Sequence, residues 1–218
     1  GLVLALATLV WQLLLCGLSG APAGSAVTPL PWLAVTPLGA GVAVLVQFLG
    51  TVIAAFSSRY LEGEANQPRF VRSLAGVLLA VHLLLLANHW LVLIAAWGLI
   101  GVALERLLCF YPDRPLALLA AHKKYMADRV ADVLLIAAAL LAWSVVGSGS
   151  FSDLWQFIAT QESSLSLQLS AVCLALAVVL RTALLPVHGW LTQVMEAPTP
   201  VSALLHAGVV NLGGFILI

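Results

Sequence analysis

The feature that most constrains this chain is a series of apolar runs, each about as long as a helix that crosses a bilayer. The hydrocarbon core requires about 20 apolar residues in a helix. The runs are continuous rather than alternating, which favours helices over a β-barrel. We therefore expect an all-α, polytopic transmembrane helix bundle with about seven spans. These lie near residues 2–18, 38–58, 71–87, 90–110, 123–146, 168–186 and 200–218.

Composition supports a membrane protein and excludes several other classes. Hydrophobic residues make up 62% of the 218 residues and charged residues 8%, too few charges to cover a soluble domain. The formal net charge is +0, so no basic patch suggests a nucleic-acid partner. Cys16, Cys109 and Cys173 lie far apart and form no metal motif, and no glycine fingerprint for NADH is present. We expect no cofactor in this chain and no catalysis by it alone.

Basic residues alternate between the joints that connect the predicted spans. The joints 58–72 and 106–124 contain several Lys or Arg, whereas 19–37, 87–89 and 147–167 contain none. The positive-inside rule places the first two joints in the cytoplasm and the other three outside. The start of the chain then lies on the cytoplasmic side, and so does the joint before the last span. Prolines indicate a loop over 19–37, and a short interfacial helix is predicted within 147–167.

Ionisable residues inside the spans are the functional candidates, because they are costly in lipid and usually face protein or water. Lys124, Asp128 and Asp132 follow one another at i,i+4, and Arg129 precedes Asp132 by three residues, so they are neighbours on one helix. A simpler interpretation is that the lysines extend to the headgroups. The candidates for a proton pathway are Glu105, Lys123, Asp128, Asp132, Arg181 and His206.

Prolines predict breaks near the last two candidates. Pro186 cannot donate to the helix that carries Arg181, so we expect a broken helix near 181–190 whose free carbonyls line a polar path. Pro198 and Pro200 separate the last span, which places His206 about two turns inside it. Arg181 could instead extend to the inner interface, and His206 could be a hydrogen-bonded core residue. We treat His82 and His89 as structural.

Residues 181–218 resemble the proton-conducting antiporter-like membrane subunits. This family includes the large subunits of respiratory complex I and of multisubunit sodium/proton antiporters. The shared pattern is a basic residue, Leu185-Pro186, Trp190-Leu191, then Pro198–Leu204 and His206. The resemblance implies that residues 1–218 form a single transmembrane domain, equivalent to the second through eighth helices of a longer subunit. The first helix and the C-terminal half would be missing.

The chain departs from the family pattern at two positions. The family's lysine in its seventh helix falls on Arg181, and its glutamate after a tryptophan falls on Gly98, after Trp97. Glu105, two turns further along, is expected to replace that acid, and Lys123 matches the lysine of the sixth helix. We expect Glu105, Lys123, Asp132, Arg181 and His206 to converge in one polar seam in the cytoplasmic half of the bilayer.

Residues 204–215 are more similar to the DabB subunits of bacterial inorganic-carbon transporters than to complex I. The resemblance implies a proton- or cation-translocating subunit of the bacterial inner membrane. Such a subunit energises CO₂ or bicarbonate uptake with a soluble partner, DabA, which alone would contain zinc. Two alternatives remain. The chain could be a proton-pumping subunit of an NADH:quinone oxidoreductase or Na⁺/H⁺ antiporter, or a structural anchor whose path is lost because of Gly98 and Arg181.

Overall fold

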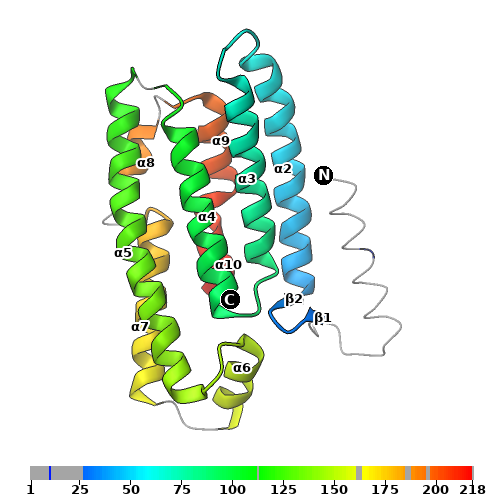
Figure 1. The fold of residues 1–218 in the computed structure, drawn as a ribbon, viewed down its shortest axis with the longest axis vertical. Coiled ribbons are helices and arrows are strands. Elements are labelled where there is room, and N and C mark those ends of the chain that lie inside the picture. The colour runs from blue at the N-terminus through cyan, green and yellow to red at the C-terminus, as the bar shows by residue number, and fades with distance from the viewer. Residues whose placement is uncertain are drawn as a thin grey trace.

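The structure is a computed structural model of the chain, and it describes residues 10, 27–111, 113–160, 164–184, 188–194 and 197–217. The predicted span 2–18 lies outside the described residues, apart from Val10, and so does Pro186. The rest of the fold is a helical bundle (Figure 1).

Four long helices form the first part of the bundle. Five helical segments of the described chain are long and apolar enough to cross a membrane: these four and the stretch Thr199–Leu217. The prediction of a polytopic helix bundle is therefore confirmed, although the count of about seven spans is only approximate. The four helices are α2 (Pro37–Tyr60), α3 (Gln67–Leu85), α4 (Trp90–Leu108) and α5 (Pro115–Val146).

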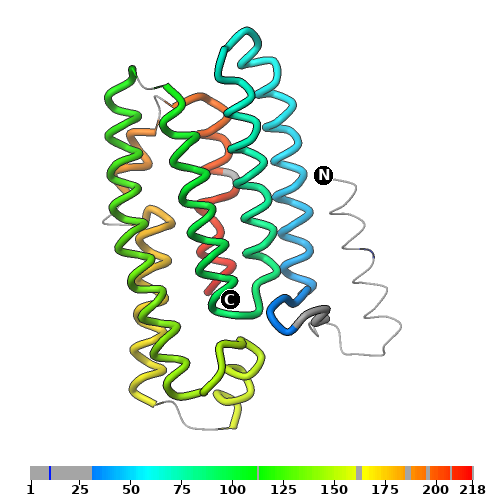
Figure 2. Tube along the Cα trace, viewed as in Figure 1, coloured from blue at the N-terminus to red at the C-terminus, as the bar shows by residue number. Residues whose placement is uncertain are grey.

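The second part of the bundle is built from shorter pieces. Helix α9 contacts α2, and α10 contacts α7, so the returning chain connects the two sides of the bundle and passes behind α4 in Figures 1 and 2. The last predicted span is interrupted by one turn of 3₁₀ helix. The pieces are α7 (Leu165–Arg181), α8 (Gly189–Gln193), α9 (Thr199–Ala207), η2 (Val209–Asn211) and α10 (Leu212–Leu217).

The joints between helices group at two opposite ends of the molecule. Figure 1 shows the α2–α3 and α4–α5 connections at the same end as α8, and the α3–α4 turn and α6 (Phe151–Thr160) at the other. This grouping agrees with the alternation of basic residues. Two short strands, β1 (Val27–Leu30) and β2 (Leu33–Val35), form an antiparallel hairpin within the segment that we expected to be a loop.

Backbone pairing holds the end with few basic residues together. Ala34 N donates to Leu86 O at 2.9 Å, and Trp90 N donates to Gly149 O at 3.0 Å. These bonds satisfy backbone groups of the strand, the turn and the loop before α6, which would otherwise be costly at a membrane interface.

Helix α5 begins earlier than the sequence suggested. Pro115 occupies its first turn, where the missing N–H has no helical partner to lose. The charged residues that we placed in the first turns of a span from residue 123 therefore lie deeper. Lys124 is more than two turns inside the helix.

A stripe of small residues brings α5 and α7 together. The buried positions of α5 recur at helical spacing and are mostly alanine: Ala117, Ala120, Ala121, Lys124, Asp128, Ala131, Leu135, Ala138, Ala139 and Ala142. Small side chains allow close backbone approach in a membrane, where apolar burial drives little association. Ser170 of α7 uses this approach to donate from Oγ to Ala138 O at 2.7 Å. The same stripe contains Lys124 and Asp128, so α7 and α8 cover buried charges.

Candidate functional site: a buried row of ion pairs

Arg181 is the last residue of α7, and it lies deep in the bundle. Figure 1 shows α7 packed along one half of α5 and α8 beside the other half, so the end of α7 faces the middle of α5. Ala183 has a φ of 53°, in the left-handed region that ends helices. The helix therefore ends before it reaches Pro186. A cation at a helix C-terminus also interacts favourably with the helix dipole.

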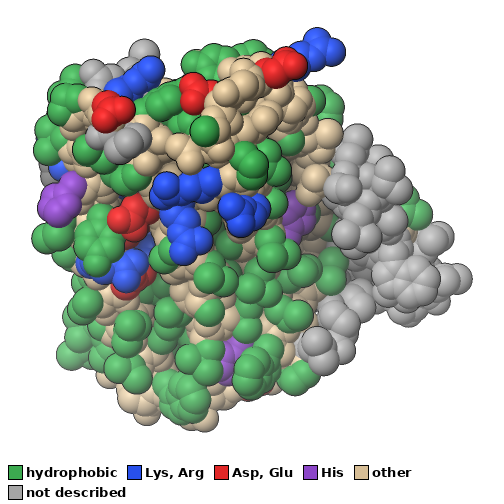
Figure 3. Space-filling view, turned by 45° about the horizontal axis from the view of Figure 1, so that its top comes forward, with side chains coloured by type: hydrophobic (Ala, Val, Ile, Leu, Met, Phe, Trp, Pro, Cys, Tyr) green, Lys and Arg blue, Asp and Glu red, His purple; other side chains and the backbone are tan. Residues whose placement is uncertain are grey.

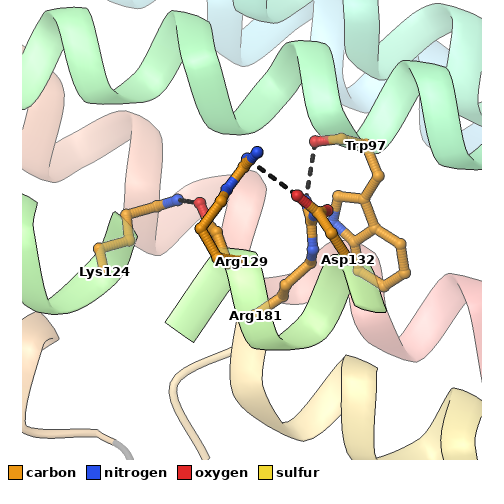
Figure 4. A network of polar contacts seen from close by, with 6 residues as sticks. Trp97, Lys124, Arg129, Asp132 and Arg181 are labelled. Atoms are coloured by element: carbon orange, nitrogen blue, oxygen red, sulfur yellow. Dashed lines mark hydrogen bonds and ion pairs between the residues drawn. The ribbon is translucent and has the colours of Figure 1, made fainter. Parts of the chain in front are cut away.

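Arg181 joins three helices through its guanidinium group (Figure 4). Nη2 forms an ion pair with Asp132 of α5, and Nη1 donates to the carbonyl oxygen of Trp97 on α4 at 2.8 Å. The guanidinium carbon lies 5.0 Å from the centre of the Trp97 ring, within range of a cation–π interaction. The Arg181 side chain is only 4% exposed, which argues against the alternative that it extends to the membrane interface.

A second ion pair lies one turn along α5. Lys124 donates to Asp128, and both side chains are buried, at 7% and 5% exposure. The Lys124 ammonium also lies 5.7 Å from the centre of the Trp190 ring on α8. Because an unpaired charge is costly in this environment, each member of the pair depends on the other.

Gly101 of α4 lies where the two ion pairs meet. A Cβ atom at Gly101 would be 3.1 Å from Oδ2 of Asp128 and 4.0 Å from Nη1 of Arg181. The absence of a side chain therefore makes room for both charged groups against the backbone of α4. Asp128 and Arg181 therefore border the same position of α4, so the two pairs form one row of charges.

The row becomes more accessible toward Arg129. Arg129 Nη2 lies 2.8 Å from Oδ2 of Asp132, and the two side chains are 45% and 19% exposed. Asp132 therefore bridges the buried Arg181 and the exposed Arg129. The row runs from the enclosed Lys124 to this accessible end.

The structure brings together only some of the predicted candidates. Asp128, Asp132 and Arg181 meet, whereas the half-buried Glu105 forms no ion pair with the row among the described residues. Lys123 is exposed, and its buried neighbour Lys124 takes the expected place.

His206 is also exposed, so the expected convergence does not include it or Lys123. The reason is helical register. One residue changes the direction of a side chain by about 100°, and a family motif does not determine which neighbour faces the core.

Helix α9 begins at Thr199, with Pro198 as its N-cap residue and Pro200 in its first turn. The predicted break near 181–190 is confirmed by the end of α7 at Arg181, although Pro186 itself lies outside the described residues.

Two contributors to the site were not predicted, the Trp97 carbonyl and Gly101, and Lys124, which the spacing placed in the row with Asp128, was not among the pathway candidates. The Trp97 carbonyl and Gly101 carried no signal, because backbone groups and small residues acquire a role only through their neighbours. Within the described part of the chain, no three His, Cys, Asp or Glu side chains gather closely enough to bind a metal.

Comparison with known proteins identifies the class to which this bundle belongs. Residues 87–218 match the family model described as NADH:quinone oxidoreductase/Mrp antiporter, TM. The solved Mrp complex from Dietzia sp. DQ12-45-1b contains a similar chain, with a TM-score of 0.78 and 25% identity over 91% of this chain and 23% of that one. The protein belongs to this antiporter-like family of multi-pass membrane subunits.

Within the family, the relatives include subunits of inorganic carbon transporters. The "Probable inorganic carbon transporter subunit DabB" of Hydrogenovibrio crunogenus is 44% identical over 86% of this chain and 36% of its own length. The corresponding DabB2 of Halothiobacillus neapolitanus is 42% identical over 95% and 38%. The "NADH-ubiquinone oxidoreductase chain 5" of Metridium senile is 32% identical over 80% and 29%. The chain thus spans little more than a third of the length of these transporter subunits.

Proposed function

We propose that this chain is the proton- or cation-conducting part of a membrane subunit that energises inorganic-carbon uptake in a bacterial inner membrane. A soluble zinc protein of the DabA type would be the partner that handles CO₂ or bicarbonate, and zinc would be bound there only. The similarity to DabB subunits supports the choice of substrate class. The start of the chain would lie on the cytoplasmic side.

The observation that carries the proposal is the buried row of ion pairs between α5 and α7. Membrane interiors tolerate charges where they serve transport, and here Lys124, Asp128 and Arg181 are all buried. A proton that binds Asp128 would neutralise it and release the Lys124 ammonium, whereas a proton lost from Lys124 would release Asp128. Arg181, which stays protonated in nearly any setting, would act as a fixed charge that keeps Asp132 ionised.

Buried polar atoms beside the row support a hydrated path. Arg181 Nε and Trp190 Nε1 are buried and have no hydrogen-bond partner among the described residues. Buried groups of this kind are normally satisfied by protein or ordered water. We propose that water reaches them and connects the two ion pairs. The more exposed Arg129–Asp132 end would then be one entrance.

The test measures bicarbonate uptake in cells that produce the full-length subunit together with its zinc partner. Asp128→Asn removes the charge that pairs with Lys124 and should reduce uptake at least tenfold. Asp153→Asn is the control, because Asp153 is an exposed carboxylate on α6, far along the chain from the row. Unchanged uptake in Asp128→Asn, with equal protein in the membrane, would favour a structural anchor.

The respiratory alternative is favoured by one specific observation, the 32% identity to a subunit of NADH-ubiquinone oxidoreductase. Purification of the full-length protein separates the two readings. An inorganic-carbon transporter should copurify with a soluble zinc protein, and its uptake should stop when a protonophore collapses the proton gradient. Copurification with quinone-reductase subunits would instead support the respiratory role.

A further inference from the structure

A basic groove lies between α3 and α4, away from the row of ion pairs. It has a volume of about 340 Å³ and lies at the end of the bundle where the basic joints group. Its walls carry Arg69 and Arg72 of α3 and Arg106 of α4. Figure 3 shows basic side chains gathered in the middle of one face of the molecule, with hydrophobic side chains below them. The other lining residues are Ser73, Gly76 and Ala103.

Small residues make this groove concave. A Cβ at Gly76 would lie 3.7 Å from Cβ of Ala103, so the two helices approach closely there and leave no bulky side chain in the floor. Ser73 is buried and presents a hydroxyl beside the arginines. The lining of the groove therefore includes a polar residue near the arginines.

The arginines of the groove lack an acidic partner within the described part of the chain. The ion pairs of that part involve neither Arg69, Arg72 nor Arg106, and Arg72 uses Nε on its own helix, donating to Pro68 O at 3.2 Å. Three guanidinium groups around one groove create a site for an anion with several oxygens. Guanidinium groups bind phosphate oxygens in pairs through parallel N–H donors.

An apolar track continues from the groove toward the middle of the membrane. Leu79 lies on the same helical face as Arg72 and Gly76, and it is 73% exposed; Leu99 lies on the face of Arg106 and is 55% exposed. Because α3 and α4 run antiparallel, both leucines lie on the membrane side of the arginines. The pattern is a charged headgroup site above a surface for acyl chains.

We propose that this groove binds the phosphate group of an anionic phospholipid, with Arg69, Arg72 and Arg106 around the headgroup and the acyl chains along Leu79 and Leu99. The apolar track favours a lipid over free phosphate, which would gain nothing from it. Basic pockets at the cytoplasmic side of membrane helices are suited to such headgroups.

The experiment counts lipids bound to the purified full-length subunit by native mass spectrometry, with phosphatidylglycerol as the probe. Arg72→Gln/Arg106→Gln should weaken phosphatidylglycerol binding by roughly tenfold or more. The matched control is Arg59→Gln/Arg114→Gln, which removes one arginine from each of the same two joints but none from the groove. The affinity of this control variant for phosphatidylglycerol should stay within about twofold of the wild type.

Four results would overturn the proposal. Equal losses of phosphatidylglycerol binding in the two double variants would mean that the arginines act only through general surface charge. Equal binding of phosphatidylcholine would exclude recognition of an anion, and displacement by inorganic phosphate alone would exclude the acyl track. Crosslinking of the groove to another subunit, without bound lipid, would make it a protein interface. Arg72→Lys/Arg106→Lys should restore part of the affinity, because the charges remain.

Discussion

Arg181 of α7 donates a hydrogen bond of 2.8 Å to the main-chain oxygen of Trp97, which is 84 residues earlier in the chain, on α4. The same guanidinium group is paired with Asp132 of α5. One side chain thus connects three helices at the level where α7 ends. A lysine, with a single ammonium, does not have the planar fork that makes both contacts at once.

The first prediction concerns the two arginines that share Asp132. Arg181→Gln should destabilise the protein by about 1.5–3 kcal/mol, because Asp132 keeps only its partly exposed pair with Arg129 and the Trp97 carbonyl loses its donor. Arg129→Gln should cost about 1 kcal/mol or less, since Arg129 is 45% exposed. Arg181→Lys should retain part of the uptake. Thermal unfolding in detergent measures the stability of Arg181→Gln and Arg129→Gln. Equal shifts in their unfolding midpoints would show that Arg181 stabilises the protein no more than a surface residue does.

Neighbouring lysines provide the second prediction. Lys124→Gln removes a buried charge and leaves Asp128 unpaired, so uptake should fall at least tenfold. Lys123→Gln changes an exposed side chain and should leave uptake within about twofold of the wild type, as surface changes usually have small effects. Bicarbonate uptake at matched protein levels checks both. A larger effect at Lys123 would restore the sequence-based assignment of the pathway.

Two glycines of α4 give a third, steric prediction. Gly101→Ala would place a methyl group 3.1 Å from Asp128 Oδ2, so the ion pair must shift or the helices must separate. We expect a loss of about 1–3 kcal/mol in stability and reduced uptake. Gly98→Ala meets nothing within 4 Å and should be neutral or slightly stabilising, because alanine is the better helix former. Equal midpoints of thermal unfolding in the two variants would contradict the close approach of Asp128 to Gly101.

The α5–α7 contact supplies a fourth prediction. Ser170→Ala removes the hydrogen bond to Ala138 O and should lower stability by about 0.5–2 kcal/mol, the range for polar contacts between membrane helices. Ser144→Ala is the control, since Ser144 is exposed and bonds only to Leu141 O of its own helix. The difference between their midpoints of thermal unfolding measures the contribution of the hydrogen bond between the helices. Equal midpoints would show that this hydrogen bond does not stabilise the protein.

Membrane orientation is the subject of the fifth prediction. In a variant without its native cysteines, Glu64→Cys lies in the basic α2–α3 joint and Gln156→Cys lies on α6, at the opposite end. The positive-inside rule predicts that an impermeant reagent labels Gln156→Cys but not Glu64→Cys in intact cells. The reverse pattern would invert the topology, and labelling after lysis confirms that both sites are reactive.

The sequence alone determined the class of fold, the approximate helices and the family. Runs of apolar residues are sufficient for this, because a bilayer accepts few other structures. The sequence also indicated the row of charges on α5, since spacing of three and four residues survives any change in tertiary context. Arg181 is a candidate from the sequence because it is a charge within an apolar run and precedes Pro186 by five residues.

Only the tertiary structure decided which charges meet. Lys123 and Lys124 are equivalent in composition, but α5 turns Lys124 toward α8 and Lys123 outward, because the alanine stripe sets which face α7 covers. His206 fits the family motif, yet it lies on the exposed side of α9. The Trp97 carbonyl became an acceptor for Arg181 because α7 ends at that depth. Partners of this kind depend on helix ends and rotations, which local sequence specifies only within a residue or two.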